Sequence, residues 1–209
     1  MNIRFASISL VIASLLAAPQ LHADSLVDGS VEAGKARSLT CTACHGQAGN
    51  SVNPMWPNIA GQNAPYLLAQ LEAFKNGSRN DPLMSSQAML LSAEDMRNLA
   101  VYFESLPAAA MAVADTKSIA RGEALYRGGN EDTKVAACLA CHGPTGRGNP
   151  AAKYPALNGQ HAAYAAKQLR DYASNKRQSD GKTRMMRDIA ARLSEEDIVA
   201  LTAYIQGLK

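Results

Sequence analysis

CTACHG, residues 41–46, places two cysteines three residues apart and a histidine directly after the second. In a helix the thiols of Cys41 and Cys44 lie about one turn apart, so both can hold a single flat group from one side. Thiols at this spacing form thioethers with the two vinyl groups of haem, and the next residue, His45, can then bind the iron. The stretch therefore predicts a covalently attached haem c.

The same pattern recurs as CLACHG at residues 138–143, with Cys138, Cys141 and His142 in the same order. Four cysteines in an exported chain could instead form two structural disulfides, or two CxxC pairs could hold one zinc ion. Both copies are followed by glycine, and the chain has no other cysteine. Two attached haem groups therefore explain the sequence better than either alternative.

The first 23 residues are typical of an export signal. They contain Arg4, an apolar run from Phe5 to Ala18 and the small-residue cleavage site Leu21-His22-Ala23. The apolar run of about 14 residues is short for a bilayer span, which needs about 20, and no later segment is apolar enough to cross a membrane. We therefore expect a cleaved signal peptide and a mature chain in the bacterial periplasm, where covalent haem attachment is feasible.

The charge balance excludes one class of partner. The full chain has 21 basic and 18 acidic residues, and the signal removes only Arg4. The resulting net charge of +2 for the mature chain is not that of a nucleic-acid binder, so we expect no nucleic-acid partner.

The chain contains one domain written twice. Two pairs of segments match: WPNIAGQNAPYLLAQL (56–71) with YPALNGQHAAYAAKQL (154–169), and SAEDMRNLAVYFESL (92–106) with SEEDIVALTAYIQGL (194–208). The offset between the copies grows from 97 at the cysteines to 98 at Gly61 and 102 at Ser92, as insertions in surface loops would produce. The predicted domains are residues 24–106 and 119–209, joined by the alanine-rich linker 107–118.

Each copy is predicted to be helical. Ser92 and Ser194 precede acidic residues that suit the first turn of a helix, and strand patterns are almost absent. About 90 residues make a marginal core, which a covalently held haem would complete. The fold class is therefore all-α, with two tandem domains, each around one haem.

The opposite axial ligand is predicted to be methionine, Met84 in the first copy and Met186 in the second. Each lies eight residues before its serine cap, in what the sequence suggests is a loop. His161 aligns with Asn63, so the two copies cannot both use a second histidine. Met89 and Met185 are the neighbouring alternatives, whereas Met96 is expected to fill the core.

Several other aligned residues have expected roles. A proximal histidine usually donates its second ring proton to a fixed acceptor, and Pro57 and Pro155 follow the two histidines at distances that suit a carbonyl on a rigid loop. Trp56 and its equivalent Tyr154 are expected to pack near the haem edge or in the core. Tyr102 and Tyr204 are expected to pack helices together.

These residues resemble the dihaem cytochrome c4 family. The resemblance rests on tandem CxxCHG, the paired Pro-x-x-x-Gly-Gln segments, ALYRGG (124–129) and AYIQGL (203–208), and it covers the whole mature chain. It implies two class I cytochrome c domains related by a pseudo-twofold axis, ligated by Cys41, Cys44, His45 and Met84 and by Cys138, Cys141, His142 and Met186. NDPLMSSQAM around Met84 differs from GKTRMMRDIA around Met186, which makes Met84 the weaker assignment.

The resemblance also implies a function. Such proteins carry single electrons in the periplasm, associate with the membrane, and pass electrons from a membrane cytochrome donor toward a terminal oxidase. Because protein ligands fill both axial positions of each iron, we expect no small-molecule substrate and no enzyme activity. One rival is the cytochrome subunit of a periplasmic dehydrogenase such as sulfide-oxidising flavocytochrome c. A second is a dihaem enzyme of the peroxidase or thiosulfate-oxidising kind, which would need an open iron.

Overall fold

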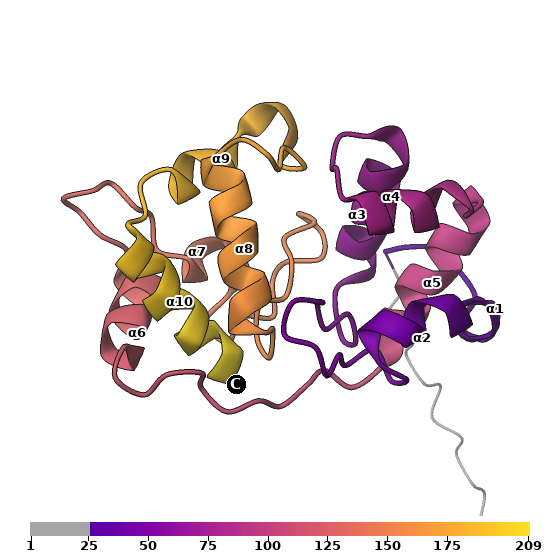
Figure 1. Ribbon diagram of the computed structural model, residues 1–209, viewed down its shortest axis with the longest axis horizontal. Helices are drawn as coiled ribbons and strands as arrows, with labels where there is room; N and C mark the ends of the chain where they lie inside the picture. The colour runs from indigo at the N-terminus through magenta and orange to yellow at the C-terminus, as the bar shows by residue number, and fades with distance from the viewer. Residues whose placement is uncertain (1–25) are drawn as a thin grey trace, which may run out of the picture.

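The computed structural model describes residues 26–209, and the predicted signal peptide lies outside that range. The described chain forms two groups of helices, α1–α5 and α6–α10, which stand side by side in Figure 1. Within residues 26–209 the only β pairing consists of isolated bridges. The predicted all-α class is therefore confirmed.

The two groups repeat the same order of elements. The amino-terminal half holds α1 (Val31–Arg37), α2 (Leu39–His45), α3 (Ala64–Asn76), α4 (Pro82–Met89) and α5 (Ala93–Ser105). The carboxyl-terminal half holds α6 (Ile119–Gly128), α7 (Leu139–His142), α8 (Ala162–Ala173), the 3-10 turn η1 (Gly181–Thr183), α9 (Met185–Ala190) and α10 (Glu195–Gly207). Residues 107–118 contain no helix and run along the lower edge of both halves in Figure 1.

The last helix of each half begins with a capping box. The hydroxyl of Ser92 accepts a hydrogen bond from the backbone of Asp95 (3.0 Å), and the Asp95 carboxylate accepts one from the Ser92 backbone (2.9 Å). Ser194 and Asp197 repeat both bonds at 3.1 and 3.0 Å. Each box satisfies backbone groups that a helix start leaves unpaired, and both predicted N-caps are confirmed.

The first and last helices of each half cross in contact through a glycine. A methyl group on Gly34 in α1 would lie 2.0 Å from the carbonyl oxygen of Asn98 in α5, and one on Gly122 in α6 would lie 2.1 Å from that of Ala200 in α10. These distances leave room only for hydrogen. The helix pair in each half can therefore approach closely enough to bury a shared core.

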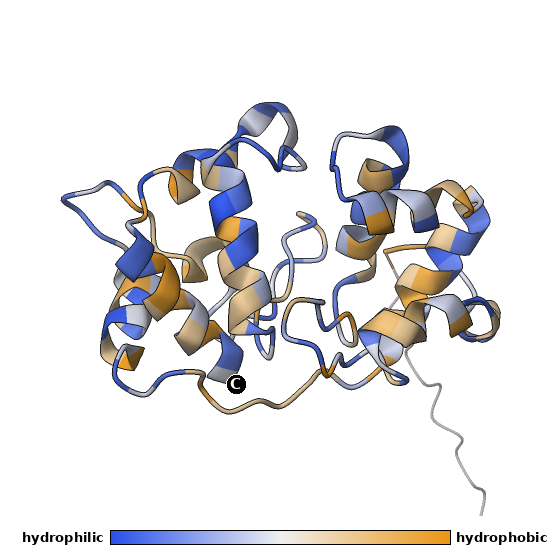
Figure 2. Cartoon of the chain, in the orientation of Figure 1, coloured by the Kyte–Doolittle hydropathy of each residue, from blue (hydrophilic) through white to orange (hydrophobic). Residues whose placement is uncertain are grey.

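Each half has its own apolar core. The amino-terminal core includes Leu91, Met96, Leu99, Tyr102 and Phe103, and the carboxyl-terminal core includes Leu125, Tyr126, Leu201, Tyr204, Ile205 and Leu208. Met96, Tyr102 and Tyr204 are thus packing residues, as predicted. In Figure 2 the apolar colour follows α5 and α10, whereas the loops after α3 and α8 are mainly hydrophilic.

The halves meet at a junction made of reciprocal hydrogen bonds. The amide of Gln62 donates to the carbonyl of Ala156 (2.9 Å) and accepts from its N–H (2.8 Å). The amide of Gln160 makes the same two bonds with Asn58, at 2.8 and 2.9 Å. Each residue and its equivalent 98 positions later exchange partners, which is the pattern that a twofold axis imposes.

No helix within residues 26–209 has the length and apolar character needed to cross a membrane.

Candidate functional sites

The helix α2 carries the first cysteine pair and its histidine. It ends at His45, and the C-cap residue Gly46 has a φ of +79°, which is favourable only for glycine. A methyl group on Gly46 would lie 2.1 Å from the carbonyl oxygen of Asn50. The glycine that completes CxxCHG thus turns the chain sharply after the histidine. This turn allows the following loop to return toward the His45 side chain.

His45 is held in one orientation by a backbone carbonyl. Its side chain is buried, and Nδ1 lies 2.8 Å from the carbonyl oxygen of Pro57. An Nδ1–H that donates to this oxygen leaves the lone pair on Nε2, the atom that binds a metal. The carbonyl predicted at Pro57 is therefore present.

The carboxyl-terminal half repeats this arrangement on α7. His142 is buried, and its Nδ1 lies 3.0 Å from the carbonyl oxygen of Pro155. Gly143 has a φ of +77°, and its carbonyl oxygen accepts a hydrogen bond from the buried Tyr126 hydroxyl (2.6 Å). Tyr154, next to the proline, places its ring 6.3 Å from the His142 ring. Its aromatic side chain thus packs beside His142, and its expected place near a haem edge stays a prediction.

Burial keeps both imidazoles neutral. It lowers the pKa of His45 and His142 below the ordinary value, and the hydrogen bonds to Pro57 and Pro155 only partly oppose it. A neutral imidazole retains the lone pair that a protonated one loses. Burial therefore favours, for both histidines, the form that can bind iron.

The cysteines are not arranged for disulfides or for zinc. All four thiols are free, and the two pairs belong to different halves: Cys41 and Cys44 lie in α2, whereas Cys138 is the N-cap of α7 and Cys141 lies within it. Nowhere in residues 26–209 do three or more histidine, cysteine, aspartate or glutamate side chains gather in a way that could hold a metal ion. Two separate sites, each with two thiols and one imidazole, are what the fold provides.

The two predicted methionines occupy equivalent, partly buried positions. Met84 lies in the first turn of α4 and Met186 in the first turn of α9. Their neighbours point outward: the exposed fraction is 61% for Met89 and 38% for Met185. The loop predicted at both methionines is wrong, because each segment forms a short helix.

The start of α4 explains the helix at Met84. The carboxylate of Asp81 accepts hydrogen bonds from the backbone of Leu83 (3.2 Å) and Met84 (3.1 Å), and Pro82 occupies the first turn. An aspartate cap followed by proline favours a helix start. The cap bonds directly to the backbone of Met84 and so fixes its position.

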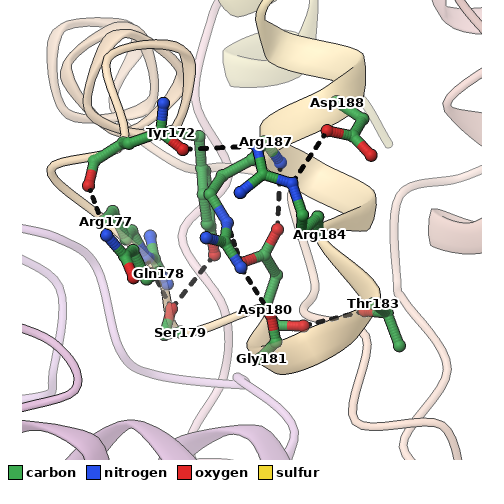
Figure 3. Close-up of polar contacts among 11 residues, drawn as sticks. Tyr172, Arg177, Gln178, Ser179, Asp180, Gly181, Thr183, Arg184, Arg187 and Asp188 are labelled. Atoms are coloured by element: carbon green, nitrogen blue, oxygen red, sulfur yellow. Dashed lines mark hydrogen bonds and ion pairs between the residues drawn. The ribbon is translucent and has the colours of Figure 1, made fainter.

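An ion pair fixes the equivalent segment of the carboxyl-terminal half. The Asp180 carboxylate accepts from Arg187 Nε (2.8 Å) and from the Arg187 backbone N–H (3.0 Å), and both side chains are less than a tenth exposed. The guanidinium also donates to the carbonyl of Gly181. Figure 3 shows these contacts closing the turn that leads into α9. Arg187 directly follows Met186, so the pair holds the backbone of the predicted ligand.

His161, the remaining described histidine, has a junction role. It is buried, and its Nε2 lies 2.8 Å from the carbonyl oxygen of Ser51 in the other half. Its equivalent, Asn63, donates across the junction to the carbonyl of Tyr154 (2.9 Å). The two residues that the alignment pairs thus both bond the opposite half.

Sequence reasoning missed the junction residues. Gln62 and Gln160 belong to the repeated Pro-x-x-x-Gly-Gln segment, and only its proline was assigned a role. The glycine has one too, since Gly61 and Gly159 both have a φ of +67° and lie against the linker at Ala108 and Ala109. The signal was available: identical polar residues at one constant offset, with no part in holding a cofactor.

The donor set fits haem c. Each site combines two thiols beside a neutral imidazole whose Nδ1 is engaged, which leaves Nε2 for iron. In the amino-terminal half Cys41 packs against the apolar core together with other partly buried apolar side chains, namely Ile59, Leu67, Leu68 and Leu71. Thiols, an axial nitrogen and an apolar lining are what a covalently attached haem needs.

Similarity to known proteins supports two haem-binding domains. A family model for cytochrome c matches residues 31–107 and again residues 119–209. Cytochrome c4 from Pseudomonas aeruginosa is 44% identical over 180 residues, which cover 86% of this chain and 89% of that protein. The chain belongs to the cytochrome c4 family.

Structural similarity agrees with this assignment. The crystal structure of reduced recombinant cytochrome c4 from Pseudomonas stutzeri matches with a TM-score of 0.84 and 43% identity, over 87% of this chain and all of that one. A thiosulfate dehydrogenase electron acceptor from Stutzerimonas stutzeri is 32% identical over 82% of this chain and 80% of that protein. As a member of the cytochrome c4 family, the protein is a dihaem electron carrier with two covalently bound haem c groups, and it is not an enzyme.

Proposed function

We propose that each iron is held by one histidine and one methionine, His45 with Met84 and His142 with Met186. The thioethers would form at Cys41 and Cys44 and at Cys138 and Cys141. The observation that carries this proposal is the repeated geometry, in which a buried histidine is fixed by a proline carbonyl and a partly buried methionine lies in the first turn of a short helix.

The residues of the chain then have defined tasks in electron transfer. Bound haem c supplies an iron that gains and loses one electron. Pro57 and Pro155 hold the two imidazoles in one tautomer, and the methionine sulfurs favour the reduced iron and so raise the potential into the range of electron carriers. With one histidine and one methionine holding each iron, the chain would leave no coordination position for a substrate.

Single substitutions test the ligands. We expect Met186→Ala to reduce the sulfur-to-iron charge-transfer band of the oxidised protein by about half, because the other haem keeps its methionine. Met84→Ala should remove the other half. Met185→Ala and Met89→Ala are the matched controls, and a band that falls in a control and not in its partner would move the ligand to the neighbouring methionine. Intact mass should show two haems per chain.

We further propose that the protein acts in the periplasm, where it carries electrons from a membrane cytochrome to a terminal oxidase and associates with the membrane surface. The family assignment and the predicted export signal support this. Fractionated cells should contain the holoprotein in the periplasm or bound to washed membranes by salt-sensitive contacts. Reduced protein should be reoxidised by membranes in a reaction that oxidase inhibitors stop, and the absence of reoxidation would contradict the oxidase assignment.

A second candidate is that the protein accepts electrons from a periplasmic dehydrogenase. The relative named thiosulfate dehydrogenase electron acceptor favours it, and the alternative of a flavocytochrome subunit belongs to the same class. Stopped-flow reduction separates the candidates. A dehydrogenase partner would reduce this protein faster than the membrane donor does, whereas a permanent subunit would also co-purify with its dehydrogenase.

A further inference from the structure

Two arginines are buried at the junction without an acidic partner. The side chains of Arg79 and Arg177 come from the loops that follow α3 and α8, their residues are 8% and 5% exposed, and their backbones pair in an isolated antiparallel bridge. Within residues 26–209 neither arginine forms an ion pair. Buried charges in proteins are usually paired, so this pair requires a reason.

The Arg79 guanidinium binds neutral groups of both halves. Nη1 donates to Gln70 in its own half (2.9 Å), and Nη2 donates to Tyr164 and Gln168 in the other half, both at 2.9 Å. Its Cζ lies 4.4 Å from the centre of the Phe74 ring. All these protein partners are uncharged side chains.

The Arg177 guanidinium makes the mirrored set of contacts. It donates to Gln168 in its own half (2.8 Å) and to Tyr66 and Gln70 in the other half, at 2.8 and 2.9 Å. Its Cζ lies 4.6 Å from the centre of the Tyr172 ring, the equivalent of Phe74. Both guanidinium groups therefore share the same two glutamines and lie together on the pseudo-twofold axis.

The positive field at this point acts on a neighbouring phenol. Burial tends to raise the pKa of Tyr66, but Arg177 and Arg79 outweigh it and hold that pKa below the ordinary value. The charges of both arginines therefore act on a phenol that Arg177 bonds directly.

One helix separates the arginines from the cofactor side of the amino-terminal half. In α3, Tyr66 and Gln70 bond the arginine pair, whereas Leu67, Leu68 and Leu71 pack against the apolar core of this half, as Cys41 does. The width of a helix, roughly 10 Å, thus lies between the charges and the apolar side of the site. Equivalent residues of α8, Tyr164 and Gln168, place the same pair beside the carboxyl-terminal half.

We propose that Arg79 and Arg177 form one shared positive centre that raises the reduction potentials of both haems together. Ferric iron carries one more positive charge than ferrous iron, so a nearby fixed cation favours the reduced state. A charge inside the protein acts more strongly at such distances than one in water and is screened less by salt. This role goes beyond electron carriage and depends neither on the identity of the partners nor on which methionines bind iron.

The central test is a redox titration of the holoprotein with the two haems resolved by NMR. Arg79→Gln keeps a polar side chain and removes one charge, and we expect the electron affinity of both haems to fall by about two- to tenfold; tenfold corresponds to 59 mV for one electron. Arg177→Gln should do the same. Arg79→Lys keeps the charge and should restore most of the loss.

A second variant neutralises the pair without removing an arginine. Gln70 accepts from both guanidinium groups at 2.9 Å, so Gln70→Glu would place a carboxylate against both. This variant gains charge-assisted hydrogen bonds and should fold, while lowering both potentials. Asn76→Asp, which adds the same charge at the exposed end of α3, is the matched control and should change the potentials much less.

The outcomes separate a field from a structural role. Unchanged potentials in Arg79→Gln and in Gln70→Glu would overturn the proposal. A shift at only the haem of the substituted half would show that the centre is not shared and would overturn it as well. Should small-angle scattering show that Arg79→Gln separates the halves, the result for the intact Gln70→Glu protein decides.

Discussion

The two methionine-bearing segments differ, although they descend from one duplicated sequence. In the amino-terminal half the partly buried Asp81 cap and Pro82 start α4 within a short turn. In the carboxyl-terminal half the turn is four residues longer and contains η1, and a buried ion pair between Asp180 and Arg187 holds α9. The same methionine position is therefore fixed by an aspartate cap in one half and by a buried charge pair in the other.

The junction residues, in contrast, keep the same spacing in both halves. Each junction residue of the amino-terminal half has its equivalent 98 positions later, and this offset does not change along the segment. The residues are Asn58, Gln62, Tyr66, Gln70 and Arg79. An insertion here would shift one side of every reciprocal pair and break bonds in both halves. A segment that bonds only its own half, such as the turn before Met84 or Met186, can change in length without breaking bonds in the other half. The contrast shows which parts of the duplicated domain remained free to diverge.

Breaking the ion pair should have the largest effect. Arg187→Met leaves the buried Asp180 carboxylate without its cation, which typically costs about 3–5 kcal/mol of stability. We expect guanidinium unfolding of the carboxyl-terminal half at lower denaturant, and imidazole should displace the ligand of its haem before that of the other. The equivalent Ser85→Ala should change stability by less than about 0.5 kcal/mol. Equal losses of stability in Arg187→Met and Ser85→Ala would show that the two segments are not held by different contacts.

Alanine substitutions at the two helix crossings should lower stability by similar amounts in both halves. Gly34→Ala and Gly122→Ala each force a methyl group against a backbone oxygen, and overpacking of this kind costs about 1–3 kcal/mol. Gly128, at the end of α6, has no atom within 4 Å of where its Cβ would lie, so Gly128→Ala should be neutral or stabilising. Thermal unfolding measures all three. A tolerated Gly34→Ala beside a damaging Gly122→Ala would show that the halves pack differently.

The halves should also differ in electron affinity. Residues 24–110 carry five basic and eight acidic residues, whereas residues 111–209 carry 15 basic and 10 acidic residues. A more positive surrounding favours ferrous iron, so the carboxyl-terminal haem should be reduced first. Each unit charge at about 15 Å contributes only ~0.3 kcal/mol in water, and salt reduces it, so we expect a separation of tens of millivolts. Reduction of the Cys41–Cys44 haem first at low salt would refute this.

The smallest effect concerns the capping boxes. Hydrogen bonds from Ser92 hold the pKa of Asp95 below its ordinary value; burial tends to raise that of Asp197, but Arg121 and Ser194 outweigh it. A lowered pKa gives stability that is present above the unfolded pKa near 4 and is lost as pH falls through the folded value. Asp197→Asn should therefore weaken the pH dependence of unfolding between pH 5 and about pH 3, by less than about 1 kcal/mol. Asp95→Asn, at the more exposed box, should weaken it less.

Local patterns were sufficient for much of the fold and the sites. The CxxCH spacing, the carbonyls of Pro57 and Pro155 and the caps at Ser92 and Ser194 depend on neighbours close in sequence, so the sequence predicts them. Asp180 and Arg187 were not recognised, because charges in a variable segment suggest solvent, and only the fold shows them buried. The arginine pair was missed for the same reason, since its partners lie about a hundred residues away. The ligand set and the domain limits remain predictions.

The linker, residues 107–118, changes what the junction must achieve. Two separate proteins that met through amide and guanidinium hydrogen bonds would pay the full entropic cost of association and would need a large apolar interface to stay together. Tethering replaces that encounter with an intramolecular one at an effective concentration near millimolar. The junction can therefore remain polar and still hold two redox centres at a fixed spacing. A protease cut within the linker should let the halves drift apart on dilution, and electron exchange between them would then depend on protein concentration.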